Sequence, residues 1–236
     1  MRVSEHVAWL KVNGLNPILV MAGGENILVD ACLPGQFALL KAAIQAEGVP
    51  IETLTKLVFT HQDMDHIGCV NELLSAAPGL KVYAHESETP YLDGTQTPVK
   101  LAARLEKLEE MSQSEREGVL KMKEGYAARK ISFERGLKDG EGFPEAAGFR
   151  LVHTPGHTPG HACAYVAGDK LLMTGDAMNL GAGGELQGPN PVYTKDMVLA
   201  QESLKKLQGL EIKTLICYHG GLLEGEFQPE LKKILA

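Results

Sequence analysis

The chain has 236 residues and a net charge of −7, with 44% apolar and 22% charged residues. This composition is ordinary for a globular protein with a substantial core and disfavours disorder. Lysine and arginine form only short pairs, and the balance is acidic. A nucleic-acid partner is therefore not expected, because such affinity depends on clustered cations.

The amino-terminal segment predicts neither a secretory signal nor a membrane span. Charges are scattered through residues 1–14, and no window approaches the roughly 18 apolar residues that a span requires. The four cysteines lie far apart, in apolar contexts and without a C-x-x-C pair, at positions 32, 69, 163 and 217. These features predict a cytoplasmic protein with buried free thiols and no membrane partner.

Strand-like segments open the chain. Apolar runs separated by turn-forming residues predict a β-meander at 7–12, 17–22 and 26–31. Apolar residues at helical spacing then predict a helix over 36–47, and Gly48 suits the position after its end.

A strand, loop, helix and strand follow in that order. The strands are predicted at 55–60 and 80–85, and the helix between them at 69–79. This order is typical of a βαβ unit, in which the loop lies at the carboxyl end of the first strand, where open α/β sheets bind ligands.

Residues 87–130 differ in composition from the rest of the chain, because they are rich in charged and helix-favouring residues. Leucines recur at helical spacing, and Ser112 with Glu115 forms a capping-box pattern that opens a second helix. We interpret the segment as a helical insertion. Amphipathic spacing leaves open whether it covers the substrate as a lid, pairs two subunits in a homodimer, or is an ordinary packed helix pair.

The carboxyl half returns to strands. They are predicted at 149–154, 161–168, 169–176 and 212–221, with a tight turn at Gly168-Asp169 and a helix at about 195–208. No linker divides the chain. We therefore expect one domain over 1–236, an α/β fold in which two sheets pack face to face with helices outside.

The loop FTHQDMDHIG, residues 59–68, concentrates metal-ligand residue types directly after a strand. It is either a crowded, solvated turn or a metal site. In an extended loop, residues 61, 63 and 65 project to one side, while 65 and 66 diverge enough to serve two centres. Because a strand and a helix fix both ends of the loop, a metal site is the better interpretation.

Three later segments each add one further ligand-type residue. His157 lies in the repeated motif HTPGHTPGH, whose prolines and glycines shape the loop, while Asp176 and His219 each follow a predicted strand. Four loops at strand ends that all supply such residues predict a common site.

These motifs resemble those of the metallo-β-lactamase superfamily. The family pattern is H-x-H-x-D-H, then a histidine in P-G-H, an aspartate after a strand and a late histidine; this chain has H-x-D-x-D-H at 61–66. The resemblance implies an αββα sandwich of two mixed sheets with two metals at one edge. It also implies that Asp30 braces the metal loop and that His161, in the second P-G-H, supports its loop.

The resemblance also implies a ligand set and a mechanism. The first metal takes His61, Asp63 and His157, the second takes Asp65, His66 and His219, and Asp176 with a hydroxide bridges both. The expected activity is hydrolysis of a small ester-like substrate, a lactone or thioester, with Asp65 orienting the nucleophile and moving the proton.

Asp63 departs from the family pattern, where a histidine is usual. A third carboxylate lowers the charge of the site, weakens the metals as Lewis acids, and makes Fe or Mn more competitive with Zn. Relatives with a carboxylate here are flavodiiron proteins, which makes a di-iron enzyme that reduces O2 or NO the rival hypothesis. A non-catalytic member of the family is a third.

Overall fold

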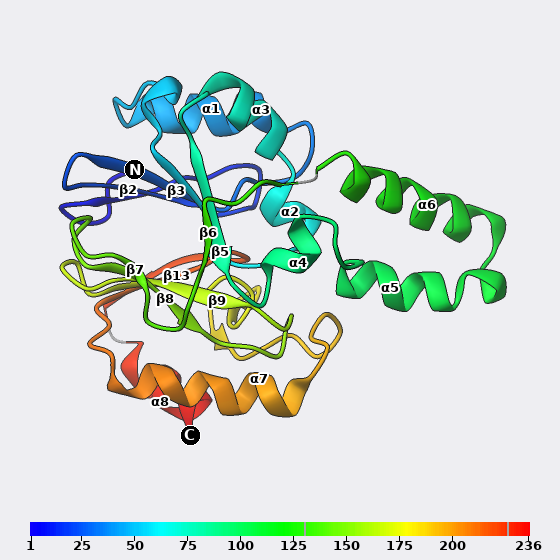
Figure 1. Ribbon diagram of the computed structural model, residues 1–236. Helices are drawn as coiled ribbons and strands as arrows, with labels where there is room; N and C mark the ends of the chain where they lie inside the picture. Colours follow the sequence, from blue (N-terminus) through cyan, green and yellow to red (C-terminus); the bar gives the residue numbers. More distant parts are fainter. Residues whose placement is uncertain (130, 226) are drawn as a thin grey trace.

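Two six-stranded sheets lie face to face in the computed structural model of the protein, which describes residues 1–129, 131–225 and 227–236 (Figure 1). Helices cover both outer faces, so the molecule has four layers. The expected αββα sandwich is confirmed. All four cysteines are buried free thiols, and no helix of the described residues is long and apolar enough to cross a bilayer.

The first sheet follows the chain, in the order β1-β2-β3-β4-β5-β6. Its strands are β1 (Val7–Trp9), β2 (Ile18–Ala22), β3 (Glu25–Val29), β4 (Lys56–Phe59), β5 (Lys81–His85) and β6 (Arg135–Leu137). The first three pair antiparallel and the last four parallel, which confirms the meander and the βαβ unit.

Helices connect the parallel strands of this sheet. They are α1 (Phe37–Ala46) with the short turn η1 (Ile51–Thr53), then α2 (Met64–Ile67) and α3 (Val70–Ala76). Helices α1 and α3 lie on its outer face (Figure 1). Since β3 and β4 are covered on both sides, their residues 27–29 and 57–59 form continuous apolar, buried runs, as in other parallel sheets.

The second sheet has the order β14-β13-β10-β9-β8-β7. Its strands are β7 (Gly142–Phe143), β8 (Phe149–His153), β9 (Ala162–Val166), β10 (Leu171–Met173), β13 (Thr214–Cys217) and β14 (Gly221–Glu224). Alternate residues serve two cores: Ala164 packs between the sheets, whereas Cys163 and Tyr165 pack toward the outer helices.

The outer helices of this sheet are α7 (Met197–Leu204), continued by η3 (Lys205–Gly209), and α8 (Gln228–Leu235). A small hairpin, β11 (Asn179–Leu180) and β12 (Leu186–Gln187), precedes α7. Strand β14 and helix α8 were not expected from the sequence. In α8 only Leu231 and Leu235 are buried, and Pro229 stands in the first turn, where proline is tolerated.

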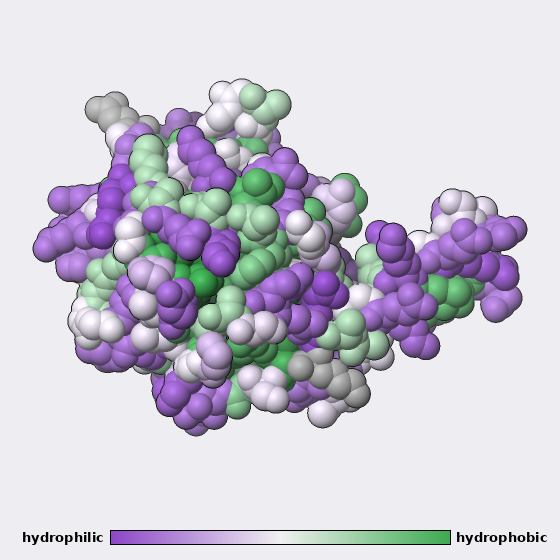
Figure 2. Space-filling model, turned by 90° about the horizontal axis from the view of Figure 1, so that it is seen from above, coloured by the Kyte–Doolittle hydropathy of each residue, from purple (hydrophilic) through white to green (hydrophobic). Residues whose placement is uncertain are grey.

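The insertion is helical, as predicted. It contains α4 (Thr89–Leu92), α5 (Val99–Glu106), η2 (Leu108–Glu110) and α6 (Gln113–Ala127). Ser112 and Glu115 form the expected capping box at the start of α6. Helices α5 and α6 make a hairpin that projects from the sandwich as a largely hydrophilic arm (Figures 1 and 2).

Candidate metal centre

All seven predicted ligand residues meet at one edge of the sandwich. Residues 61–66 follow β4, His157 lies in the loop after β8, Asp176 follows β10 and His219 follows β13. The side chains form two adjacent groups that could each hold an ion. The first is His61, Asp63, His157 and Asp176, and the second is Asp65, His66 and His219.

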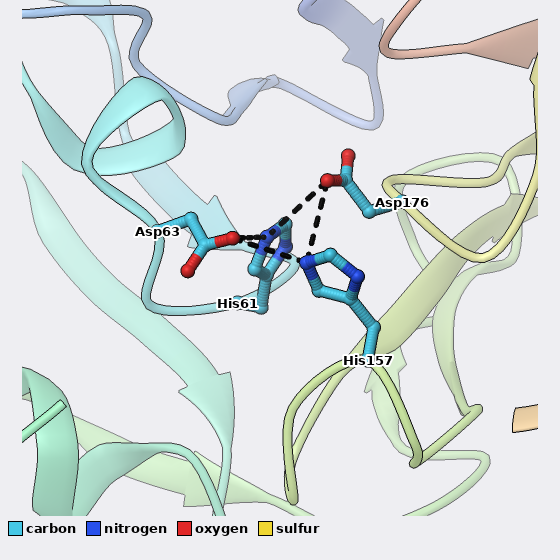
Figure 3. A group of neighbouring side chains, drawn as sticks. All are labelled: His61, Asp63, His157 and Asp176. Carbon is cyan, nitrogen blue, oxygen red and sulfur yellow. Dashed lines mark hydrogen bonds and ion pairs between the residues drawn. The ribbon is translucent and has the colours of Figure 1, made fainter. Parts of the chain in front are cut away.

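The first group is closely packed (Figure 3), and its residues are largely buried. Oδ2 of Asp63 lies 3.2 Å from Nε2 of His61 and 3.0 Å from Nε2 of His157. Oδ2 of Asp176 completes the group at 3.9 Å and 3.3 Å from the same two nitrogens. The four potential ligand atoms therefore lie close enough together to hold one ion.

The second group lies beside the first and shares Asp176. Oδ1 of Asp176 lies 3.3 Å from Nε2 of His66 and 3.4 Å from Nε2 of His219. Oδ2 of Asp65 is 3.2 Å from the same nitrogen of His219. Asp176 thus turns one oxygen toward each group, which is the geometry of a bridging carboxylate.

The loop at 61–66 is not extended throughout, and our expectation for its side chains was wrong. Asp63 precedes α2, so Asp65 and His66 lie on a helical turn and join the same group. Residue 65 therefore does not project with 61 and 63. Gly68 ends this turn and packs tightly against the Cys32–Pro34 backbone, where an added Cβ would approach backbone atoms to 2.3 Å.

Buried atoms without partners indicate that these groups fit metal ions. Among the described residues, Nε2 of His61, Nε2 of His66 and Oδ1 of Asp176 are buried without a hydrogen-bond partner. Burial, together with the neighbouring charge of His66, lowers the pKa of His61 to about 4, so its imidazole is neutral and ready to bind a cation. Uncompensated buried polar atoms are costly unless something binds them.

Asp30 braces the second group from behind, as the resemblance implied. Its fully buried carboxylate accepts hydrogen bonds from the Thr60 amide and hydroxyl, both at 2.8 Å, and lies 2.8 Å from Nδ1 of His66. A carboxylate on the far nitrogen fixes the ring and turns Nε2 toward the metal position. Asp30 has a φ of 65°, a strained conformation that asparagine and aspartate tolerate best.

His161 and Tyr218 support the ligand groups without belonging to either of them. Nε2 of His161 accepts a hydrogen bond of 3.0 Å from the amide of Asp176 and so positions that residue, which agrees with its expected supporting role. Tyr218, which the sequence did not single out, donates a hydrogen bond of 2.6 Å to the Asp65 carbonyl and packs on the ring of His66.

Glu88 is a buried carboxylate that sequence reasoning missed. Its Oε1 accepts hydrogen bonds of 2.8 Å from the amide and the side chain of Gln62, and its Oε2 accepts one of 2.7 Å from the amide of Gly160. It therefore ties the residue between ligands 61 and 63 to the loop of His157. Burial raises the pKa of Glu88 to about 7, although these hydrogen bonds oppose the shift.

Lys100 of α5 also reaches the first group. Its ammonium forms an ion pair with Oδ2 of Asp63 and lies 3.2 Å from Nε2 of His157. The sequence pattern of the insertion gave no sign of this contact, because Lys100 is one of many charged residues there. Both ligand groups border a cavity of about 560 Å³, whose walls include residues of α5, α6 and the segment 179–193.

The chain matches a family model described as the metallo-beta-lactamase superfamily over residues 12–219. It is 29% identical over 225 residues to the "Probable metallo-hydrolase YflN" of Bacillus subtilis (strain 168), covering 88% of this chain and 80% of that protein. It is also 29% identical over 201 residues to the hydroxyacylglutathione hydrolase of Xylella fastidiosa (strain M23). That match covers 84% of this chain but only 56% of the relative's length.

Solved structures have the same fold. The metallo-beta-lactamase family protein TTHA1429 from Thermus thermophilus superposes with a TM-score of 0.75 at 21% identity, covering 99% of this chain and 79% of that chain. BJP-1, a subclass B3 metallo-beta-lactamase of Bradyrhizobium japonicum, gives 0.66 at 19% identity, covering 93% and 76%.

Proposed function

Since the chain belongs to the metallo-β-lactamase superfamily, we propose that it is a dinuclear metal-dependent hydrolase of a small ester-like substrate, a lactone or thioester. The observation that carries this proposal is the pair of ligand groups that share Asp176, with one oxygen facing each. The similarity to a hydroxyacylglutathione hydrolase supports a thioester within this class.

Two divalent ions held by these groups would activate water as a nucleophile and stabilise the negative charge that develops on the carbonyl oxygen. His61, Asp63 and His157 would hold the first ion, and Asp65, His66 and His219 the second, with Asp176 shared. Zinc accepts such histidine and aspartate sets, while the three carboxylates also suit Fe or Mn.

Asp65 is the residue that we assign to proton transfer. Its side chain is 28% exposed, and it borders the cavity where a substrate would bind. In hydrolysis, the oxygen of water adds to the carbonyl carbon and the C–O or C–S bond breaks. The Asp65 carboxylate accepts the proton of water and passes it to the departing alcohol or thiol.

A second candidate function is supported by Asp63. A carboxylate in the first group favours iron, so a di-iron enzyme that reduces O2 or NO with electrons from a separate partner is the alternative. It predicts an iron-loaded protein whose absorption spectrum responds to reductant and to O2 or NO. A colourless, zinc-loaded protein that cleaves esters would exclude it.

Metal content and ester hydrolysis of the purified protein test the proposal together. We expect two equivalents of metal and turnover of model lactones or thioesters in the wild type, and loss of turnover and of at least one metal equivalent in His61→Ala. His6→Ala is the matched control, because His6 pairs with Asp169 and belongs to neither ligand group. Binding of less than one equivalent, with no change in His61→Ala, would refute the metal site. Two bound equivalents without turnover on ester, thioester and phosphoester panels would instead indicate a non-catalytic member.

A further inference from the structure

Helix α5 brings two cations to the cavity of the candidate site. Lys100 and Arg104 are four residues apart, so they lie on the same face of the helix, and both line the cavity together with Asp65 and His219. The cavity is thus formed between the ligand groups, which belong to the sandwich, and a positively charged helix face, which belongs to the insertion.

Lys100 offsets the additional carboxylate of this chain. Its ammonium pairs with Asp63, and its side chain stays 28% exposed toward the cavity. An ammonium has three N–H donors, and its contacts with Asp63 and with Nε2 of His157 leave one donor for a second anion. The ammonium contacts the same atoms of Asp63 and His157 that would hold the first ion, so a bound ion would displace it from them while it still lines the cavity, where it adds the positive charge that Asp63 removes.

The placement of Lys100 is fixed by hydrogen bonds and does not depend on a free surface side chain. The amide of Val99, the first residue of α5, donates a hydrogen bond of 2.6 Å to Oε1 of Gln62. Gln62 is in turn held by the buried carboxylate of Glu88. The start of α5 is therefore tied to the residue between ligands His61 and Asp63.

Arg104 supplies a charge that the protein itself leaves unpaired. Within the described ranges, no carboxylate lies within ion-pair distance of its guanidinium, whereas the carboxylates at the cavity floor belong to the ligand groups. We propose that Lys100 and Arg104 bind a carboxylate or phosphate group of the substrate, so that the substrate is an anionic ester, thioester or lactone. This proposal rests on the proposed hydrolase function and specifies its substrate class.

Matched substrates that differ only in charge test this inference. Two thioesters are compared, one whose acyl chain ends in a carboxylate and one whose acyl chain ends in a carboxamide, with a phosphate-ended third. We expect kcat/KM to favour an anionic substrate about tenfold or more, and this preference to fall about tenfold in Lys100→Met and in Arg104→Met. The larger preference, for carboxylate or for phosphate, identifies the group. The ratio of the kcat/KM values for two substrates does not depend on the fraction of metal-loaded protein.

Control variants separate a specific contact from the net charge. Lys107→Met removes the same charge from the end of α5, where Lys107 is exposed and outside the cavity, and should keep the preference. Lys100→Arg should keep most of the preference for the anionic substrate. A wild-type protein without preference, or a Lys100→Met variant with the wild-type ratio, would overturn the inference while leaving the hydrolase function intact.

An equilibrium measurement covers the case in which no ester is cleaved. Succinate and inorganic phosphate are titrated into zinc-loaded protein by calorimetry. Binding that weakens about tenfold in Lys100→Met supports the anion site even though the hydrolase proposal has failed. Absent binding, or binding equal in wild type and Lys100→Met, overturns the anion site as well.

Discussion

The first ligand group is more deeply buried than the second, although both border the cavity. The side chains of His61 and His157 are 0% and 2% exposed, whereas that of His219 is 37% exposed. The supports differ too: Asp63 pairs with Lys100 of the insertion, while His66 is braced by Asp30 within the sandwich. The ring of His66 is thus braced from within the sandwich, whereas Asp63 of the first group also pairs with the insertion.

Asp176→Asn should weaken both ligand groups alike, because both groups share that carboxylate. We expect loss of both metals and a fall of about 10³-fold in kcat/KM, since bound metal supplies several kcal/mol of stabilisation. Metal analysis and ester hydrolysis measure the two effects. Asp93→Asn is the control, because Asp93 belongs to neither ligand group and its side chain accepts a turn hydrogen bond from Thr95, which asparagine can keep. Retention of one tightly bound metal would show that Asp176 does not serve both groups.

Glu88→Ala should weaken the first group selectively. It leaves the buried amides of Gln62 and Gly160 without an acceptor, which costs about 3 kcal/mol of unfolding free energy. Denaturant unfolding with metal present measures this loss. Equal weakening of both metal sites would contradict a role confined to the first group.

Glu88→Gln tests the same residue through pH. The pKa of Glu88 is raised by burial to about 7, above its ordinary value of 4.5, so the folded protein holds this proton more tightly than the unfolded chain. The protonated Glu88 carboxyl contributes fully to the free energy of unfolding below pH 4.5, and this contribution is lost as the pH rises through about 7. Wild-type stability should therefore fall relative to Glu88→Gln across this window; parallel curves would contradict the raised pKa.

Asp30→Asn should weaken the second group only. The variant keeps the shape of the brace but removes the charge that orients His66, which lowers metal affinity about 10- to 100-fold. Titration with a chelator should show one site weakened and the other unchanged. Loss of affinity in the first group would mean that the two groups are not supported separately.

Asp63→His should have the smallest effect on activity, and it tests how the insertion acts on the first ligand group. It restores the usual family residue, removes the partner of Lys100, and should shift metal preference toward zinc with a few-fold change in activity. In a double-mutant cycle with Lys100→Met, we expect a coupling of about 1 kcal/mol. Unchanged metal preference and activity would show that Asp63 does not tune the site electrostatically.

The sandwich and the convergence of the candidate ligands could be predicted because their signals are local. Each candidate follows an apolar strand, and strand ends meet at one edge of a sheet, so the sequence places His157, Asp176 and His219 near the loop at 61–66. The roles of Glu88 and Lys100 could not be predicted. They depend on contacts with residues 62 and 63, which only the packing of the insertion against the metal loop brings into reach.

The distribution of ligands over the two sheets also bears on how the fold holds together. His61 and Asp63 follow a strand of the first sheet, whereas His157 and Asp176 follow strands of the second. An ion bound by all four would therefore cross-link the two halves of the chain and close a loop of nearly a hundred residues. By mass action it would stabilise only the assembled sandwich, so chelation should lower the melting temperature of the whole domain rather than loosen a single loop.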